Sequence, residues 1–208
     1  PRKANALTQA HGDLIRQFIE SALDRGLKVY FQMSATRPSG LNDEDRPRLP
    51  NGHLPDRMAD TGCLASQAIR SYNEAYVRDM LAAYPQITGF RPDWPEYPCY
   101  KLDEAFQDFN PQVKVWAAQH GFDFEGIRSD VNALYTYLHG GLQNRDLVEL
   151  AGANRGKTAM AIWLKKYPHI LDWLRLKTAL SNDLIRHWHS IITKHGGADK
   201  ELSVNAFM

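Results

Sequence analysis

The sequence contains few cysteines, no excess of charge of either sign and no long apolar run. Cys63 and Cys99 are too few to build the disulfide framework of a small secreted domain, so the cellular compartment stays open. The 25 basic and 24 acidic residues give a net charge of +1, which predicts neither a nucleic-acid partner nor an anionic membrane surface. No stretch approaches the roughly 18 apolar residues of a membrane span, and no signal peptide is visible. What remains is a globular chain of 208 residues, long enough for a sizeable core.

Regular patterns of apolar residues divide much of the chain into helices and strands. Residues 7–24 and 67–84 carry apolar side chains at three- and four-residue spacing, which predicts two amphipathic helices. Short apolar runs predict strands at residues 27–34, 87–93 and 202–207. The order strand, helix, strand is a βαβ unit, so we expect parallel strands joined by a right-handed crossover. Residues 36–64 contain four prolines and are expected to form a long loop without a regular element.

Each predicted strand has one apolar and one polar face. Because side chains alternate along a strand, Gln32 and Ser34 share one face of the first strand. In the same way Arg91 and Asp93 share a face of the second strand, and Asn205 lies on the polar face of the third. A parallel sheet buried on both sides should instead be almost continuously apolar. The pattern predicts the α/β class and an incomplete TIM (β/α)8 barrel, with about three parallel strands and a polar mouth at their carboxyl ends. A structural Arg–Asp pair that closes one end of the sheet is the alternative.

The middle of the chain is predicted to be helical. Helices are expected at residues 111–119, 124–138, 145–150, 158–166 and 169–194. This stretch is far longer than an ordinary connection between a strand and a helix. We therefore divide the chain into a barrel segment at residues 1–102, a helical insertion at 103–166, and a barrel helix with its following strand at 167–208. The insertion is expected to form a lid or a substrate-shaping subdomain.

The end of the second strand supplies the most distinctive side chains. Arg91 and Asp93 are two residues apart and point the same way, so the cation would hold Asp93 in its charged form. Glu96 lies beyond the strand end on a loop stiffened by prolines. Two carboxylates in different environments are what glycoside cleavage requires. Trp94 and Tyr97 add flat faces of the kind on which sugars stack, unless they belong to the core.

These residues resemble a known group of proteins. The run Gly-Phe-Arg-Pro-Asp-Trp-Pro-Glu-Tyr-Pro at residues 89–98, with residues 27–30, 63–76 and 202–207, is similar to bacterial glycoside-hydrolase-like (β/α)8 barrels. The resemblance covers the two ends of the chain and not its helical middle. Gly-Phe-Arg-x-Asp also looks like the strand that carries the nucleophile in the α-amylase superfamily, although Tyr97 stands where that superfamily has a histidine. The resemblance implies strands three to five of a barrel. Because the sequence also starts at Pro1 without a methionine, close to the first predicted helix, and stops at Met208 in what reads as a strand, we expect the chain to be a fragment.

The predicted function is hydrolysis of a glycosidic bond in a carbohydrate. Asp93 is expected to act as nucleophile or electrostatic stabiliser, Arg91 to hold its charge, and Glu96 to serve as acid/base. Further substrate contacts are expected from Gln32, Ser34, Trp94, Tyr97 and Asn205. No metal and no cofactor is predicted, and the oligomeric state stays open. The alternatives are a non-catalytic carbohydrate-binding barrel and a barrel isomerase or lyase, which would need clustered metal ligands.

Overall fold

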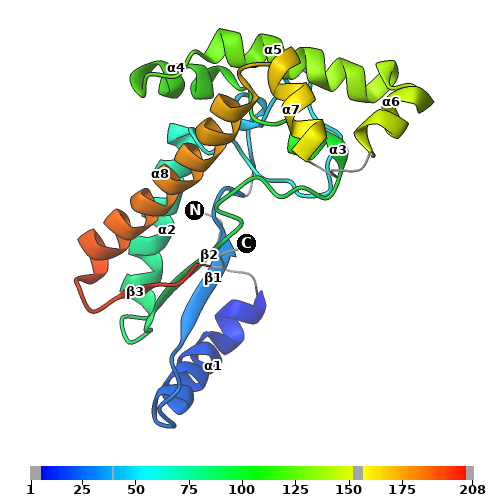
Figure 1. Cartoon of the computed structure of the whole chain (residues 1–208). Coiled ribbons are helices and arrows are strands. Elements are labelled where there is room, and N and C mark those ends of the chain that lie inside the picture. Colours follow the sequence, from blue (N-terminus) through cyan, green and yellow to red (C-terminus); the bar gives the residue numbers. More distant parts are fainter. Residues whose placement is uncertain (1–5, 39, 152–156, 205–208) are drawn as a thin grey trace. The chain divides into compact units, whose positions relative to one another are not determined.

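The chain forms two compact units that are interleaved along the sequence. The computed structural model describes residues 6–38, 40–151 and 157–204 (Figure 1). Unit 1 comprises Pro1–Ala35, Arg70–Asp93 and Arg186–Met208, and unit 2 comprises Thr36–Ile69 and Trp94–Ile185. Helices α2 (Gln67–Ala83) and α8 (Ile170–Gly196) contribute residues to both units.

Unit 1 holds a small parallel sheet. Its elements are helix α1 (Ala6–Leu23) and strands β1 (Tyr30–Ser34), β2 (Gly89–Asp93) and β3 (Glu201–Leu202), with the strands in the spatial order β1-β2-β3. Both neighbouring pairs run parallel, as the βαβ pattern predicts. The register pairs Gln32 with Arg91 and Ser34 with Asp93, so the predicted alternation of faces is carried across the two strands.

The expected incomplete TIM barrel is wrong, because the described residues form one small three-stranded parallel sheet and no barrel. A barrel closes only when its last strand pairs with its first, which takes about eight tilted strands in this fold. The described residues form three strands of at most five residues, and β3 is only two residues long. β1 and β3 are therefore the edges of one short sheet. A sheet that packs helices on one face and leaves the other accessible shows the same alternation of polar and apolar residues as a barrel strand. The sequence pattern cannot distinguish the two.

The apolar face of the sheet packs against α2, and within unit 1 α8 lies beside α2 (Figure 1). Phe90 is buried, and its ring centroid lies 6.3 Å from that of Tyr76 in α2, edge to face. The ring nitrogen Nε2 of His187 in α8 lies 3.2 Å from the carbonyl oxygen of Arg70 in α2. Trp188 is fully buried one residue later. These contacts give unit 1 a core of its own.

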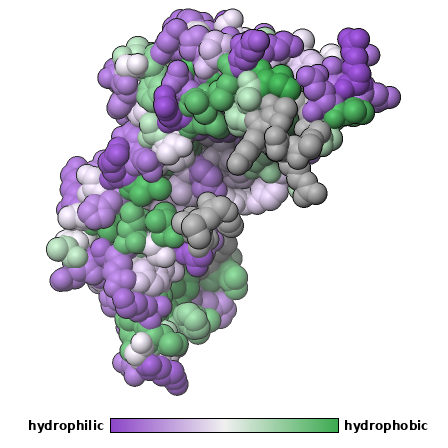
Figure 2. Space-filling model, viewed as in Figure 1, coloured by the Kyte–Doolittle hydropathy of each residue, from purple (hydrophilic) through white to green (hydrophobic). Residues whose placement is uncertain are grey.

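Helix α1 keeps most of its apolar side chains at the surface. Ile19 is buried, and the guanidinium of Arg16 donates a hydrogen bond of 3.1 Å to the carbonyl oxygen of Ala83. Leu14 and Phe18, however, are 58% and 71% exposed, and Figure 2 shows apolar surface over this helix. The three- and four-residue spacing thus predicted the helix, while only part of its apolar stripe is covered by the described residues.

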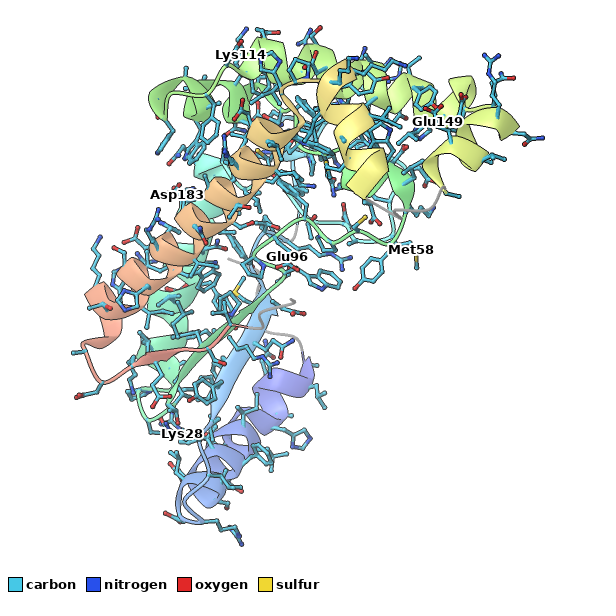
Figure 3. The ribbon with its side chains drawn as sticks, viewed as in Figure 1. Lys28, Met58, Glu96, Lys114, Glu149 and Asp183 are labelled. Atoms are coloured by element: carbon cyan, nitrogen blue, oxygen red, sulfur yellow. The ribbon has the colours of Figure 1, made fainter. Side chains whose placement is uncertain are left out.

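Unit 2 is built from short helices around an aromatic core. Its further elements are the 3-10 turn η1 (Asp43–Asp45), α3 (Leu102–Ala105), α4 (Pro111–Gln119), α5 (Phe124–Thr136), the π-helical turn η2 (Tyr137–Gly141), α6 (Asn144–Leu150) and α7 (Lys157–Lys166). Phe106 stacks on Trp173 of α8, with ring centroids 5.5 Å apart. The indole nitrogen of Trp116 in α4 donates to Asp183 in α8 at 3.0 Å, and Figure 3 marks Asp183 on that helix.

The described residues of the long loop between β1 and α2, 36–38 and 40–66, pack within unit 2. The backbone nitrogen of Gly62 donates to the carbonyl oxygen of Thr36 at 2.8 Å, which ties the two ends of the loop together. The backbone nitrogen of Cys63 donates to the carbonyl oxygen of Asp45 at 2.7 Å. Leu49 and Leu64 are buried. The loop therefore packs as a compact body, which explains why it exceeds an ordinary connection in length.

Candidate functional site

The polar face of the sheet carries four of the predicted site residues. Because paired residues of parallel strands point to the same face, Gln32 lies beside Arg91, and Ser34 lies beside Asp93. Gln32 is exposed and the other three are partly exposed, so this face is accessible. The Oγ atom of Ser34 is buried and has no hydrogen-bond partner among the residues that the structure describes. Ser34 and Asp93 are the last residues of β1 and β2, and Gln32 and Arg91 lie in the middle of these strands.

A contact between Tyr30 and Glu201, at the amino ends of β1 and β2, lies on the same face of the sheet. The hydroxyl of Tyr30 donates a hydrogen bond to the carboxylate of Glu201, across Gly89 in the central strand. A side chain at position 89 would have its Cβ 1.9 Å from the carbonyl oxygen of Glu201. Glycine is therefore the residue that lets β3 approach β2 at this level.

The remaining predicted residues lie elsewhere. Trp94, Glu96 and Tyr97 follow β2 and belong to unit 2, and Figure 3 shows Glu96 on the segment after this strand. Trp94 has a positive φ of 54°, a conformation that is uncommon for a bulky residue and is often found at functional sites. Tyr97 is buried, with its hydroxyl turned toward a carboxylate of the core. Asn205 lies outside the described residues.

The carboxylate that Tyr97 contacts is Asp108, the centre of a buried polar cluster in unit 2. Its Oδ2 accepts from the Tyr97 hydroxyl at 2.9 Å, and its Oδ1 accepts from the backbone nitrogens of Arg48 at 2.9 Å and Asn110 at 2.8 Å. Burial raises the pKa of Asp108, while hydrogen bonds from Arg48, Cys63, Asn110 and Tyr97 act in the opposite direction. Asp108 thus joins the long loop, the segment after β2 and the start of α4.

The two side chains that donate to Asp108, Tyr97 and Cys63, are protonated at neutral pH. Burial raises the pKa of the Tyr97 hydroxyl and of the Cys63 thiol well above their ordinary values, and the charge of Asp108 adds to both shifts. Both groups are therefore donors to the carboxylate throughout the physiological range. Because the carboxylate oxygens of Asp108 are occupied by these donors, the cluster is suited to fixing the fold of unit 2 rather than to abstracting a proton.

Removal of the Tyr97 hydroxyl is expected to destabilise unit 2. Tyr97→Phe keeps the volume of the ring but removes its hydroxyl. Asp108 then loses one donor, and the backbone nitrogen of Leu64 loses a hydrogen bond of 3.2 Å to the hydroxyl oxygen. Leaving buried polar groups unpaired costs about 1–3 kcal/mol. Urea unfolding measures the loss, and Tyr100→Phe is the matched control because Tyr100 is 59% exposed. Equal unfolding midpoints for the two variants would contradict this prediction.

A second buried carboxylate lies nearby in the sequence. Glu104 is fully buried and accepts four backbone N–H groups, from Met58 at 2.8 Å, Ala59 at 2.9 Å, Tyr100 at 2.6 Å and Lys101 at 2.7 Å. Burial by itself would raise the pKa of Glu104, but the four donors together outweigh it and lower the pKa. The side chain therefore pins residues 58–59 of the long loop to the start of α3.

Sequence patterns did not reveal these buried carboxylates. Glu104 and Asp108 stand in the segment Leu-Asp-Glu-Ala-Phe-Gln-Asp-Phe, where carboxylates alternate irregularly with aromatic residues. Carboxylates placed among aromatic residues are the one local signal that a carboxylate of this segment is buried. Some of the donors, such as Arg48 and Cys63 for Asp108, come from positions 40 or more residues away, so spacing along the chain does not indicate them.

The described residues were also searched for a metal site and for a membrane-spanning helix. Within the ranges that the structure covers, no group of three or more His, Cys, Asp or Glu side chains is placed to hold a metal ion. In the same ranges, no helix has both the length and the apolar character needed to cross a membrane.

The comparisons with known proteins gave no match. Neither a family model, nor a curated protein, nor a solved structure matches the chain. The resemblance of residues 89–98 to glycoside-hydrolase-like barrels therefore stays a prediction. The function has to be argued from the arrangement of the chain's own residues.

Proposed function

We propose that this protein hydrolyses a glycosidic bond of a carbohydrate, with Asp93 as the carboxylate that acts at the anomeric carbon. The observation that carries the proposal is the register of β1 and β2, which gathers Gln32, Ser34, Arg91 and Asp93 on one accessible face. In open parallel sheets ligands bind at the carboxyl ends of the strands, where Ser34 and Asp93 lie. The proposal needs an open sheet only and does not depend on a closed barrel.

The residue types on this face suit a sugar. The amide of Gln32 and the guanidinium of Arg91 offer hydrogen-bond donors and acceptors to sugar hydroxyls, whereas the Oγ atom of Ser34 is buried. The carboxylate of Asp93 supplies the negative charge that stabilises, or bonds to, the positive anomeric carbon of an oxocarbenium-like transition state. Glu96, three residues after Asp93 in the sequence, stays the predicted acid for the leaving oxygen, and it belongs to unit 2. A pair of carboxylates is the minimum set for this reaction.

Substitution of Asp93 tests the proposal. In Asp93→Asn the side chain keeps its size and loses the charge that the transition state requires, so kcat/KM on a responsive glycan should fall by a factor on the order of 10³ or more with KM little changed. Asp79→Asn, a change of an exposed carboxylate in α2, should leave kcat/KM unaltered. Retained glycan binding with no hydrolysis by either wild type or Asp93→Asn, across a broad glycan panel, would show a binding module instead.

The proposed role of Glu96 has a separate signature. A general acid matters least when the leaving group is already a weak base. Glu96→Gln should therefore impair cleavage of natural glycosides strongly and cleavage of nitrophenyl glycosides much less. Equal impairment of both substrates would remove Glu96 from the acid role while leaving the test of Asp93 intact.

A further inference from the structure

A cavity in unit 2 lies where the 3-10 turn η1 meets the first turns of helices α2 and α4. Its volume is about 450 Å³, within the range of about 300–1,000 Å³ that small-molecule sites occupy. Glu44 and Asp45 of η1 line it, together with Ala68 of α2 and Gln112 of α4. Every lining residue lies in unit 2, and Glu44 is exposed, so solvent reaches the cavity. The cavity thus has the size and the access that a small ligand needs.

Asp45 places a buried carboxylate at the wall of this cavity. The residue is only 4% exposed. Its Oδ1 atom accepts hydrogen bonds from the hydroxyl of Ser66 at 2.6 Å and from the side-chain nitrogen of Gln112 at 3.1 Å. Its Oδ2 atom has no hydrogen-bond partner among the residues that the structure describes. Because a buried carboxylate is stable only when donors or a cation face it, this oxygen is where the donor of a ligand fits.

The charges around the cavity are mostly negative. The carboxylate of Glu44 is exposed and has no partner within the described ranges. Arg48 also lines the cavity, but its guanidinium donates to the carboxylate of Asp43 and, at 3.2 Å, to the carbonyl oxygen of the same residue. The carboxylates of Asp43, Glu44 and Asp45 therefore stand against one guanidinium. This excess of negative charge favours a cationic ligand.

The start of α4 does not favour an anion. The side chain of Asn110 accepts a hydrogen bond of 2.8 Å from the backbone nitrogen of Gln112. The carbonyl oxygen of Asn110 accepts from the backbone nitrogens of Val113 at 2.9 Å and Lys114 at 3.2 Å. Pro111, the first residue of the helix, has no N–H group. The described backbone donors that could bind an anion at this helix end are thus already used.

We propose that this cavity binds the ammonium group of a small primary alkylamine. The three N–H donors of an ammonium are spread around one nitrogen, so one bonds the Oδ2 atom of Asp45 while another bonds the carboxylate of Glu44. Ala68 and the ring of Pro111 offer apolar walls for the alkyl chain, of which a bare metal ion would make no use. The site is independent of the hydrolysis proposed at Asp93, because it lies wholly in unit 2.

An NMR titration of the full chain with n-butylammonium chloride tests the site. Sodium chloride keeps the ionic strength constant throughout. We expect saturable shifts of the backbone amide signals of Glu44, Asp45 and Gln112, with a Kd in the millimolar range because the ligand has few atoms. Shifts that are absent from these three signals, or that grow linearly without saturation, would overturn the proposal.

Two substitutions test the two acceptors. Asp45→Asn keeps an oxygen for Ser66 and Gln112 but removes the charge, so the Kd should rise at least about tenfold. Glu44→Gln changes an exposed side chain, so the fold is retained, and the Kd should rise about two- to fivefold, as for an exposed ion pair. Asp172→Asn removes the same charge from the surface of unit 2 and should leave the Kd unchanged. An unchanged Kd in both Asp45→Asn and Glu44→Gln would contradict the proposal.

Three further solutes separate an ammonium site from other kinds of cavity. 1-Butanol has the alkyl chain without the charge, and tetramethylammonium has the charge without an N–H donor. Both should bind at least about tenfold more weakly than butylammonium, because each lacks the charged hydrogen bond to a carboxylate. Equal binding of 1-butanol would show an apolar cavity only, and displacement of butylammonium by magnesium chloride at matched ionic strength would show a metal site. Either result would overturn the proposal.

Discussion

Glu104→Gln is expected to destabilise unit 2 by about 3–5 kcal/mol. Glutamine offers one acceptor oxygen where glutamate offers two, so its amide group would face two backbone N–H donors in place of an acceptor. Either Tyr100 and Lys101 or Met58 and Ala59 would then lose their partner. Each buried donor left unpaired costs about 1–3 kcal/mol, and the bonds to a charged acceptor are the stronger kind. Hydrogen exchange of peptides from residues 56–60 and 98–106 measures the loss locally.

The contribution of Glu104 also has a pH dependence of known sign. Its pKa is lowered in the folded chain, so the unfolded chain binds the proton more readily. The stability that the ionised carboxylate provides is therefore complete above the ordinary glutamate pKa of about 4.3 and is lost as the pH falls through the folded value. The difference in unfolding free energy between wild type and Glu104→Gln should shrink over that range. A difference that stays constant down to pH 2 would contradict this account.

Glu125→Gln is the matched control for Glu104→Gln. Glu125 lies in the first turn of α5 and pairs with Lys114 at the surface, where water screens the interaction. Its removal should leave the exchange rates of both peptides unchanged. Faster exchange in this control as well would show that any lost carboxylate in unit 2 has the same effect, and the buried position of Glu104 would then not be the cause.

Gly89→Ala is expected to separate β3 from the sheet. The new Cβ would lie 1.9 Å from the carbonyl oxygen of Glu201, with the carbonyl carbon and the nitrogen of the same residue at 2.7 and 2.9 Å. All three are backbone atoms, so a rotamer change cannot relieve the overlap. β3 has to move, which breaks the hydrogen bonds from Glu201 to Thr88 and from Ser203 to Phe90. A loss of about 3 kcal/mol in unit 1 follows from overpacking of this kind.

The measurement for Gly89→Ala is amide exchange in residues 199–204, which should become fast while exchange in unit 2 is unaffected. Gly12→Ala is the control, because no atom lies within 4 Å of a Cβ at that position in α1. The residue before it, His11, has a non-helical φ of −133° and ψ of 24°, so helix propensity adds little and this control should be close to neutral. Protection of residues 199–204 in Gly89→Ala at the wild-type level would show that the strand contact is dispensable.

The helices were largely predictable because their signals are local. Residues 111–119 were expected to be helical and form α4 (Pro111–Gln119), where Asn110 caps the first turn and proline fits the first position. The second helix, expected at 67–84, is α2, and Pro85 follows its end. Strand pairing sets the limits of a strand, and pairing is not local. The run 27–34 therefore contributes only Tyr30–Ser34 to β1.

The candidate sites were predictable only where two strands present the same alternation. Gln32, Ser34, Arg91 and Asp93 were singled out from the period of two, and the register of the sheet places them together. Asp45 and Asp108 were not found, because their setting arises from segments far apart in the chain. An aspartate in a loop looks the same in sequence whether its carboxylate faces water or lies between Ser66 and Gln112.

The interleaving of the two units determines the order in which a ribosome would complete them. Synthesis runs from the amino to the carboxyl end at roughly 5–20 residues per second. Every residue of unit 2 has been made once Ile185 is added, whereas β3 and the last turns of α8 are still to come. Unit 2 is thus the first of the two units whose whole sequence has been synthesised. β1 and β2 are synthesised well before β3, the third strand of the described sheet.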